Sequence, residues 1–370
     1  FPHGKVPPKF EFQLLENDWE HFLPYLEQAC EAFPSLADAQ VDLLNGPESF
    51  TSDGRYLMGE SPEIPNYFVA AGMNSSGIAS AGGVGRQIAD WIGDGRLRKH
   101  LWSIDFRRVQ KFQQNQRFLC ERAIETLGNH YAINAPKTEP KSARGIRRSP
   151  LYTNLVAAGA KFGVEAGWEQ PNFFASPEQT AAAVDGESPS LGAGLQPKTW
   201  GEPAWYPSAA KEYEACMTEA ALFDLSAAGK LLVVGEGALE TLSWLCTNEL
   251  KPGFVTNSPM CNGDGGIEAL VAVRELSPGS YLVTTGADKV LRDKAWIETA
   301  AIGNPLTVID VSPMYSILAV VGPKADAVVG RLLGNSGDSW EATLQEWLPG
   351  EERAVDMGLA RGRLTRSRPC

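Results

Sequence analysis

The stretch from Tyr67 to Trp91 constrains this chain most, because a short apolar run, a turn of small residues and a helical pattern follow one another directly. Tyr67, Phe68 and Val69 are β-forming residues and predict a buried strand. The mixture of apolar, small and charged residues from Val84 to Ile92 predicts a helix. The turn that joins them consists mostly of glycine, serine and asparagine.

This turn leaves its backbone uncovered, and the unpaired N–H groups where a helix begins favour an electron-rich ligand atom. We therefore predict that the turn faces a cofactor. The predicted cofactor-binding residues are Gly72, Met73, Asn74, Ser75, Ser76, Gly77 and Ile78. The alternative is that Gly77, Gly82, Gly83 and Gly85 only let strand and helix pack closely, and glycines alone do not decide between the two.

Upstream of the turn, a further set of residues carries a family resemblance. These markers are Gly46-Pro47, Thr51, Asp53-Gly54 and Met58-Gly59, followed by the small-residue turn from Gly72 to Gly77 itself and by Gly82-Gly83-Val84-Gly85. In this order and spacing, residues 46–90 resemble the C-terminal part of the flavin domain in amine oxidases of the D-amino-acid oxidase type. Within that group the chain resembles the dimethylglycine and sarcosine dehydrogenases and their relative, the regulatory subunit of pyruvate dehydrogenase phosphatase.

The rest of the chain resembles the other domains of the same group. Residues 149–174 are similar to the linking domain, with Gly167-Trp-Glu-x-Pro171 as the most specific element. A helix over 208–222 and a strand within 221–235 then begin a series of segments that looks like the folate-binding aminomethyltransferase domain of the glycine cleavage system. Its markers are Phe223-Asp-Leu-Ser226 and Val321-Gly-Pro-Lys-Ala325.

The resemblance implies an α/β and α+β multidomain fold. It consists of the C-terminal part of a D-amino-acid-oxidase-like flavin domain (1–110), a linking domain (111–205) and the first part of an aminomethyltransferase-like folate-binding domain (206–370). Residues 175–207, rich in Pro, Gly and Ser, predict a flexible loop. The chain looks like a fragment, because no Gly-x-Gly-x-x-Gly fingerprint follows a strand; these 370 residues alone are therefore expected not to hold flavin.

The cofactors implied by the resemblance are FAD and tetrahydrofolate. The implied activity is oxidation of a small N-methyl amine by hydride transfer, with the product trapped on tetrahydrofolate and an electron acceptor protein as a partner. The alternative is a non-catalytic regulatory subunit whose partner is the pyruvate dehydrogenase phosphatase catalytic subunit. Both imply a mitochondrial matrix protein, and no catalytic residue can be named from this sequence.

One departure from the family bears on the folate site, for which Glu268, Ala269 and Leu270 are the candidate residues. An acidic residue usually follows the Gly-Gly strand start in this family, and Leu270 occupies its place here. Leucine can do no proton chemistry. Glu268 and Leu270 share a strand face, so Glu268 is either an exposed strand residue or a replacement base.

Composition excludes some other classes. The formal net charge of −12 argues against a nucleic-acid or anionic-membrane partner. No apolar run reaches 18 residues, so no segment is expected to span a membrane. The six cysteines show no metal-ligand spacing, so we expect no metal site and reduced thiols.

Overall fold

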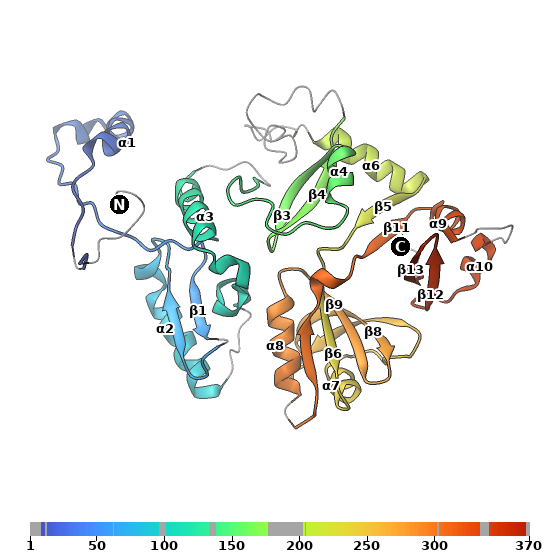
Figure 1. The fold of residues 1–370 in the computed structure, drawn as a ribbon. Coiled ribbons are helices and arrows are strands. Elements are labelled where there is room, and N and C mark those ends of the chain that lie inside the picture. Colours follow the sequence, from blue (N-terminus) through green and yellow to red (C-terminus); the bar gives the residue numbers. More distant parts are fainter. Residues whose placement is uncertain are drawn as a thin grey trace. The chain divides into compact units, whose positions relative to one another are not determined.

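The computed structural model describes residues 9–11, 13–61, 63–95, 101–132, 138–176, 203, 205–301, 303–333 and 340–367 (Figure 1). They form two compact units, the first from residues 1–106 and 116–130 and the second from residues 107–115 and 131–370. Most of the loop predicted over 175–207 lies outside the described residues.

The first unit combines a β-hairpin with helices. Its elements are α1 (Trp19–Ala32), η2 (Pro34–Asp38), β1 (Leu57–Glu60), β2 (Phe68–Ala71), α2 (Gly77–Asp94), η3 (Trp102–Ile104) and α3 (Gln116–Asn129), while η4 (Phe106–Arg108) spans the change of unit. β1 and β2 pair antiparallel. The predicted strand and helix are both present, but the strand is not buried as expected, because Phe68 and Val69 are only partly buried and Tyr67, which precedes β2, is 55% exposed. α2 begins seven residues earlier than its sequence pattern indicated, directly after the glycine-rich turn.

α2 approaches the hairpin closely at one glycine. Gly59 has a φ of +118°, and a Cβ at this position would lie 2.5 Å from the Trp91 ring. By contrast, a Cβ on Gly82, Gly83 or Gly85 would meet no described atom within 4 Å. The interpretation that these three helix glycines serve close packing with the strand is therefore wrong for the described chain.

The second unit contains the remaining elements. They are η5 (Lys111–Gln114), α4 (Tyr152–Ala157), β3 (Ala160–Glu165), β4 (Trp168–Phe174), α6 (Tyr206–Thr218), β5 (Ala221–Asp224), β6 (Gly229–Val234), α7 (Ala238–Leu245), β7 (Val255–Cys261), β8 (Ile267–Ser277), β9 (Ser280–Thr285), α8 (Val290–Ala300), β10 (Thr307–Asp310), η7 (Ser312–Met314), β11 (Leu318–Val321), α9 (Ala325–Leu333), α10 (Trp340–Glu346), β12 (Glu352–Met357) and β13 (Ala360–Thr365).

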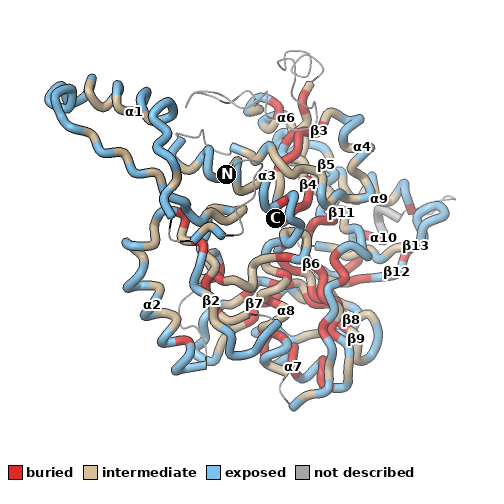
Figure 2. Tube along the Cα trace, turned by 60° about the vertical axis from the view of Figure 1, so that its left-hand side comes forward, coloured by how far each residue is buried: buried red, intermediate tan, exposed pale blue. Residues whose placement is uncertain are grey.

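A five-stranded antiparallel sheet dominates this unit, in the order β10-β6-β9-β8-β7. α7 and α8 cover one face of the sheet (Figure 1). Alternate residues of the strands, such as Leu231, Val271 and Val283, meet Leu242 and Ile297 of these helices in the largest buried apolar cluster among the described residues. Figure 2 shows this buried layer in red along the strands.

Two predicted elements need correction. The helix predicted to reach Leu222 ends at Thr218, and the single strand predicted over 221–235 is two strands, β5 and β6. A turn separates the strands, in which the backbone N–H of Ser226 donates to the Asp224 carboxylate at 3.0 Å. β5 pairs with β11 rather than with the large sheet, so tertiary pairing overrides the continuous apolar pattern.

Lys230 on β6 is fully buried. Its Nζ donates to the backbone oxygens of Ser226 and Ser312, each at 2.7 Å. Burial lowers the pKa of Lys230 to about 8, although the carboxylates of Asp310 and Asp224 oppose this shift. The folded unit therefore resists protonation of this amine relative to the unfolded chain.

The pKa shift predicts a pH-dependent stability. Between pH 8 and 10.5 the unfolded chain holds a proton on Lys230 that the folded chain has released, so the unfolding free energy should rise with pH by about 1.4 kcal/mol per unit. Urea unfolding of wild type and Lys230→Met at pH 7 to 10 should show a growing difference in favour of the wild type. Lys251→Met, at an exposed lysine, is the matched control, and a constant difference for Lys230→Met would contradict this assignment.

Candidate cofactor and ligand sites

The glycine-rich turn before α2 has an unusual backbone. Gly72, Asn74 and Ser75 all have positive φ values, of 64°, 45° and 65°. For residues other than glycine this conformation costs free energy and persists only where the surroundings enforce it. Two such residues in succession indicate a turn whose shape serves more than chain reversal.

Asn74 enforces that shape. It is buried, its Nδ2 donates to the Gly72 oxygen at 2.6 Å, and its Oδ1 accepts from the Thr51 backbone N–H at 2.9 Å. The Thr51 hydroxyl in turn donates to the Arg55 oxygen at 2.9 Å. A Cβ on Gly72 would lie 2.5 Å from the Thr51 methyl group. The family markers Thr51 and Gly72 thus hold two neighbouring turns together through Asn74.

The start of α2 is open for a ligand. Ser76, the N-cap residue, makes no side-chain capping bond. Among the described residues no acceptor receives the backbone N–H groups of Gly77 and Ile78, and the Ile78 side chain is 99% exposed. Ser75 is already engaged, since its hydroxyl donates to the Glu48 carboxylate. The backbone donors of α2 therefore offer more to an electron-rich ligand atom than the serine side chain does.

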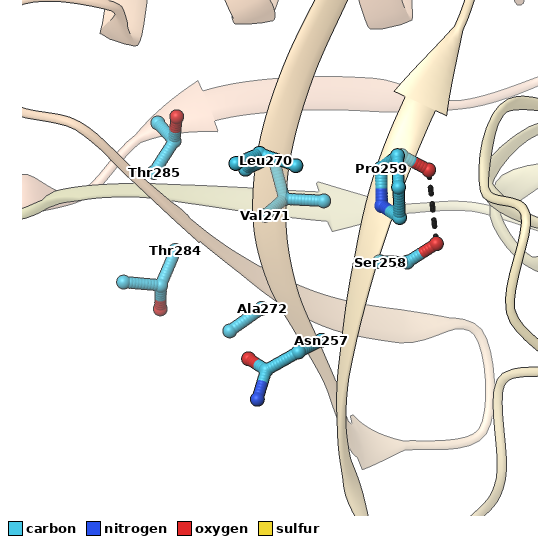
Figure 3. A pocket seen from close by; sticks show the side chains of 8 residues that line it. All are labelled: Asn257, Ser258, Pro259, Leu270, Val271, Ala272, Thr284 and Thr285. Atoms are coloured by element: carbon cyan, nitrogen blue, oxygen red, sulfur yellow. Dashed lines mark hydrogen bonds between the residues drawn. The ribbon is translucent and has the colours of Figure 1, made fainter. Parts of the chain in front are cut away.

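A second candidate site lies on the large sheet, on the face away from α7 and α8. An open pocket of about 470 Å³ is lined by Asn257, Ser258, Pro259, Leu270, Val271, Ala272, Thr284 and Thr285. Figure 3 shows that these residues come from the adjacent strands β7, β8 and β9. The Leu270 side chain is 71% exposed here, and none of the eight lining residues is ionisable.

Two of the lining residues carry polar groups without a hydrogen-bond partner, and of these only the exposed Asn257 side chain is open to a ligand. Asn257, Ala272 and Thr284 form one cross-strand row. The Thr284 hydroxyl is buried without a hydrogen-bond partner, and the Asn257 side chain makes no hydrogen bond to any described residue. Ser258 and Thr285 are instead engaged, with the Thr247 backbone N–H and the Asp293 carboxylate respectively. The pocket can therefore bind a neutral ligand that has its own donors and acceptors.

The three folate candidates are separated by the structure. Leu270 lines the pocket, whereas Ala269 is buried in the core under the helices. Glu268 shares the Leu270 face, but its carboxylate accepts from Asn262 Nδ2 at 2.7 Å in the turn between β7 and β8. Asn257 and Thr284 could not be predicted from the sequence, because only the strand register brings them beside Leu270.

Comparison with known protein families agrees with this architecture. Three family models match in order: "FAD dependent oxidoreductase" over residues 4–91, "FAD dependent oxidoreductase central domain" over 94–149, and "GCVT N-terminal domain" over 151–356. The fold and the two sites thus define a multidomain protein that joins part of a flavin domain to an aminomethyltransferase-like domain. The chain belongs to the family of the GCVT N-terminal domain.

Its relatives include both classes considered from the sequence. The mitochondrial regulatory subunit of pyruvate dehydrogenase phosphatase from Mus musculus is 31% identical over 90% of this chain and 37% of its own length. 4-Methylaminobutanoate oxidase (formaldehyde-forming) from Paenarthrobacter nicotinovorans is 32% identical over 95% of this chain and 41% of its own length. Mitochondrial sarcosine dehydrogenase from Mus musculus is 33% identical over 75% of this chain and 32% of its own length.

These matches confirm the expected fold class and the expected resemblance to the dimethylglycine and sarcosine dehydrogenase group. They also agree with FAD and tetrahydrofolate as the cofactors of that group. The chain spans only about two fifths or less of the length of these relatives. The domain boundaries predicted at residues 110 and 205 stay a prediction, because the ranges that the family models match do not test them.

Within the described ranges no helix is long and apolar enough to cross a membrane. The same part of the chain contains no group of three or more His, Cys, Asp or Glu side chains that could hold a metal ion.

Proposed function

We propose that this chain is part of a mitochondrial-matrix flavoprotein that oxidises a small N-methyl amine. The observation that carries the proposal is the strained, Asn74-locked turn that leaves the first N–H groups of α2 without acceptors. FAD fits this turn, because uncapped donors at a helix start stabilise negative charge on a ligand. Relatives named sarcosine dehydrogenase and 4-methylaminobutanoate oxidase support the substrate class.

In this proposal, bound FAD supplies the acceptor for a hydride from the amine. The residues that would hold the flavin are those of the turn, Gly72 to Ile78. The backbone N–H groups of Gly77 and Ile78 would serve as hydrogen-bond donors that stabilise negative charge on the flavin. Asn74 positions these donors without touching the ligand, since both its polar side-chain atoms are engaged within the protein.

Removing one of these donors should slow amine oxidation in the full-length protein. Ile78→Pro deletes a backbone N–H in the first turn of α2, where proline is tolerated. Loss of a hydrogen bond to a charged group costs about 1.5 to 3 kcal/mol, so the rate of flavin reduction by the amine should fall roughly 10- to 100-fold. Stopped-flow absorbance measures this rate under anaerobic conditions.

Ile78→Ala is the matched control, because it removes the same exposed side chain and keeps the N–H group. Its rate should stay close to that of the wild type. Equal rates for Ile78→Pro and Ile78→Ala, at equal flavin content, would show that this N–H group does not face the ring.

The pocket at Leu270 supports tetrahydrofolate binding as a proposal, with weak one-carbon transfer. Asn257 offers an unsatisfied amide group to a neutral heterocycle, and Leu270 offers apolar contact. No lining residue can take or give a proton near neutral pH. Release of the one-carbon product is therefore favoured over its transfer to tetrahydrofolate. The name of the formaldehyde-forming relative describes such a release for that enzyme.

The second candidate function is a regulatory subunit of pyruvate dehydrogenase phosphatase, with its catalytic subunit as partner. It is favoured by the similarity to that regulatory subunit and by the absence of ionisable groups lining the Leu270 pocket. One experiment separates the two functions. Bleaching of bound flavin in the full-length protein by sarcosine or dimethylglycine supports the enzyme, whereas no bleaching together with binding to the phosphatase catalytic subunit supports the regulator.

A further inference from the structure

A second pocket lies between α7 and the segment that follows α8, in the same unit as the Leu270 pocket. It has a volume of about 470 Å³ and is lined by Glu240, Thr241, Ser243, Trp244, Ala300 and Asn304. Because α7 and α8 cover one face of the sheet and the Leu270 pocket lies on the other, the two pockets are separate sites.

The floor of this pocket is held rigidly. Thr241 is buried, and its hydroxyl accepts from Asn304 Nδ2 at 3.3 Å. A Cβ on Gly237 would lie 2.7 Å from the Asn304 side chain, so the segment carrying Asn304 packs tightly on the start of α7. Since Nδ2 is engaged, the remaining polar atom of the Asn304 side chain, Oδ1, is an acceptor.

The rim joins an exposed aromatic ring to a free carboxylate. Trp244 is 83% exposed, which is unusual for the largest apolar side chain. Glu240 lies four residues earlier on α7, so the two side chains are neighbours on one helix face. Within the described residues, Glu240 forms no ion pair and Trp244 no hydrogen bond or ring contact.

We propose that this pocket binds an arginine side chain presented by a partner protein. A guanidinium group is planar, carries five N–H donors and stacks on aromatic rings. The pocket offers an indole face together with the acceptors of Glu240, Ser243 and Asn304. The chain already uses this pairing internally, since the Arg353 guanidinium lies 4.6 Å from the centre of the Trp347 ring.

Two further observations favour a protein over a small molecule as the source of the arginine. Leu239 beside Glu240 is 46% exposed, and a protein surface would cover it. The net charge of −12 favours a partner that is basic.

The test uses the 370-residue protein with its tryptophans replaced by 5-fluorotryptophan. The Trp244 fluorine resonance is assigned with Trp244→Phe. Titration with acetyl-Gly-Arg-Gly-amide is expected to shift this resonance saturably, whereas the neutral isostere acetyl-Gly-citrulline-Gly-amide leaves it unchanged. Glu240→Gln should lower the affinity for the arginine peptide about two- to five-fold. Glu27→Gln on α1, which makes the same change of charge elsewhere, should leave that affinity unchanged.

Three outcomes would overturn the proposal: no shift of the Trp244 resonance, an equal shift with the citrulline peptide, or equal affinity in Glu240→Gln. Tetramethylammonium, which has no N–H donors, distinguishes the other source. If it binds as tightly as the arginine peptide, the pocket takes a small cation and not an arginine side chain. None of these results depends on flavin or folate.

Discussion

Replacing Glu169 by glutamine is expected to lower the free energy of unfolding by about 3 to 5 kcal/mol. Glu169 belongs to the Gly167-Trp-Glu-x-Pro171 element and is almost wholly buried with Arg144, at side-chain exposures of 1% and 8%. Arg144 Nη2 and Nε donate to its two carboxylate oxygens at 2.5 and 3.0 Å. The Gly145 backbone N–H also donates to Glu169, at 2.6 Å.

The expected loss is large because glutamine leaves the arginine charge buried without its counter-charge. Arg144 also donates to the backbone oxygens of Pro140 and Phe162, each at 2.9 Å. The side chain therefore cannot turn toward solvent without breaking those bonds. One carboxylate thus fixes the segment around Arg144 to the β3–β4 hairpin.

Urea unfolding of the 370-residue protein measures the effect. Glu165→Gln is the matched control, because Glu165 lies on the same hairpin and its only described side-chain bond, to Gln170 at 3.0 Å, is exposed. It should change the unfolding free energy by less than about 0.5 kcal/mol. The variant Arg144→Gln/Glu169→Gln carries neither charge and should lose less stability than the two single variants added together. Strict additivity would show that the pair does not interact as described.

The sequence predicted local structure where a short pattern determines it. Phe68 and Val69 do lie on a strand, and the buried residues Ala269, Val271 and Val273 alternate with Glu268 and Leu270 as strand geometry requires. The end of the helix before Glu219 was not predictable, because β5 exists through its pairing with β11, almost 100 residues later. Local propensity contains no information about such a partner.

The candidate sites divide in the same way. The turn from Gly72 to Ile78 could be recognised from its glycines and serines. The role of Asn74 could not, because it depends on a hydrogen bond from the Thr51 backbone N–H, 23 residues earlier in the chain. Asn257 and Thr284 became visible only with the register of three strands. The arginine pocket beside Trp244 needs the tertiary packing of Asn304 against α7.

Replacing Leu270 by aspartate in the full-length protein is expected to raise folate-dependent turnover. Leu270 occupies the place where the family usually has an acidic residue, and the structure shows its side chain exposed in the pocket. A positioned general acid or base contributes about 10² to 10⁴ in rate. The rate of methylenetetrahydrofolate formation should therefore increase by about 10²-fold or more, while the rate of amine oxidation stays unchanged.

The existing carboxylate cannot supply this function from its present place. Glu268 starts one strand repeat away from Leu270, roughly 6 to 7 Å along the chain, and its carboxylate is held by Asn262 at 2.7 Å. Leu270→Asn is the matched control, since it introduces a side chain of the same shape that cannot exchange a proton. If Leu270→Asp leaves the methylenetetrahydrofolate formed per amine oxidised unchanged, and the wild type already couples the two reactions fully, another residue performs the transfer. The assignment of Leu270 to the acidic position would then be wrong.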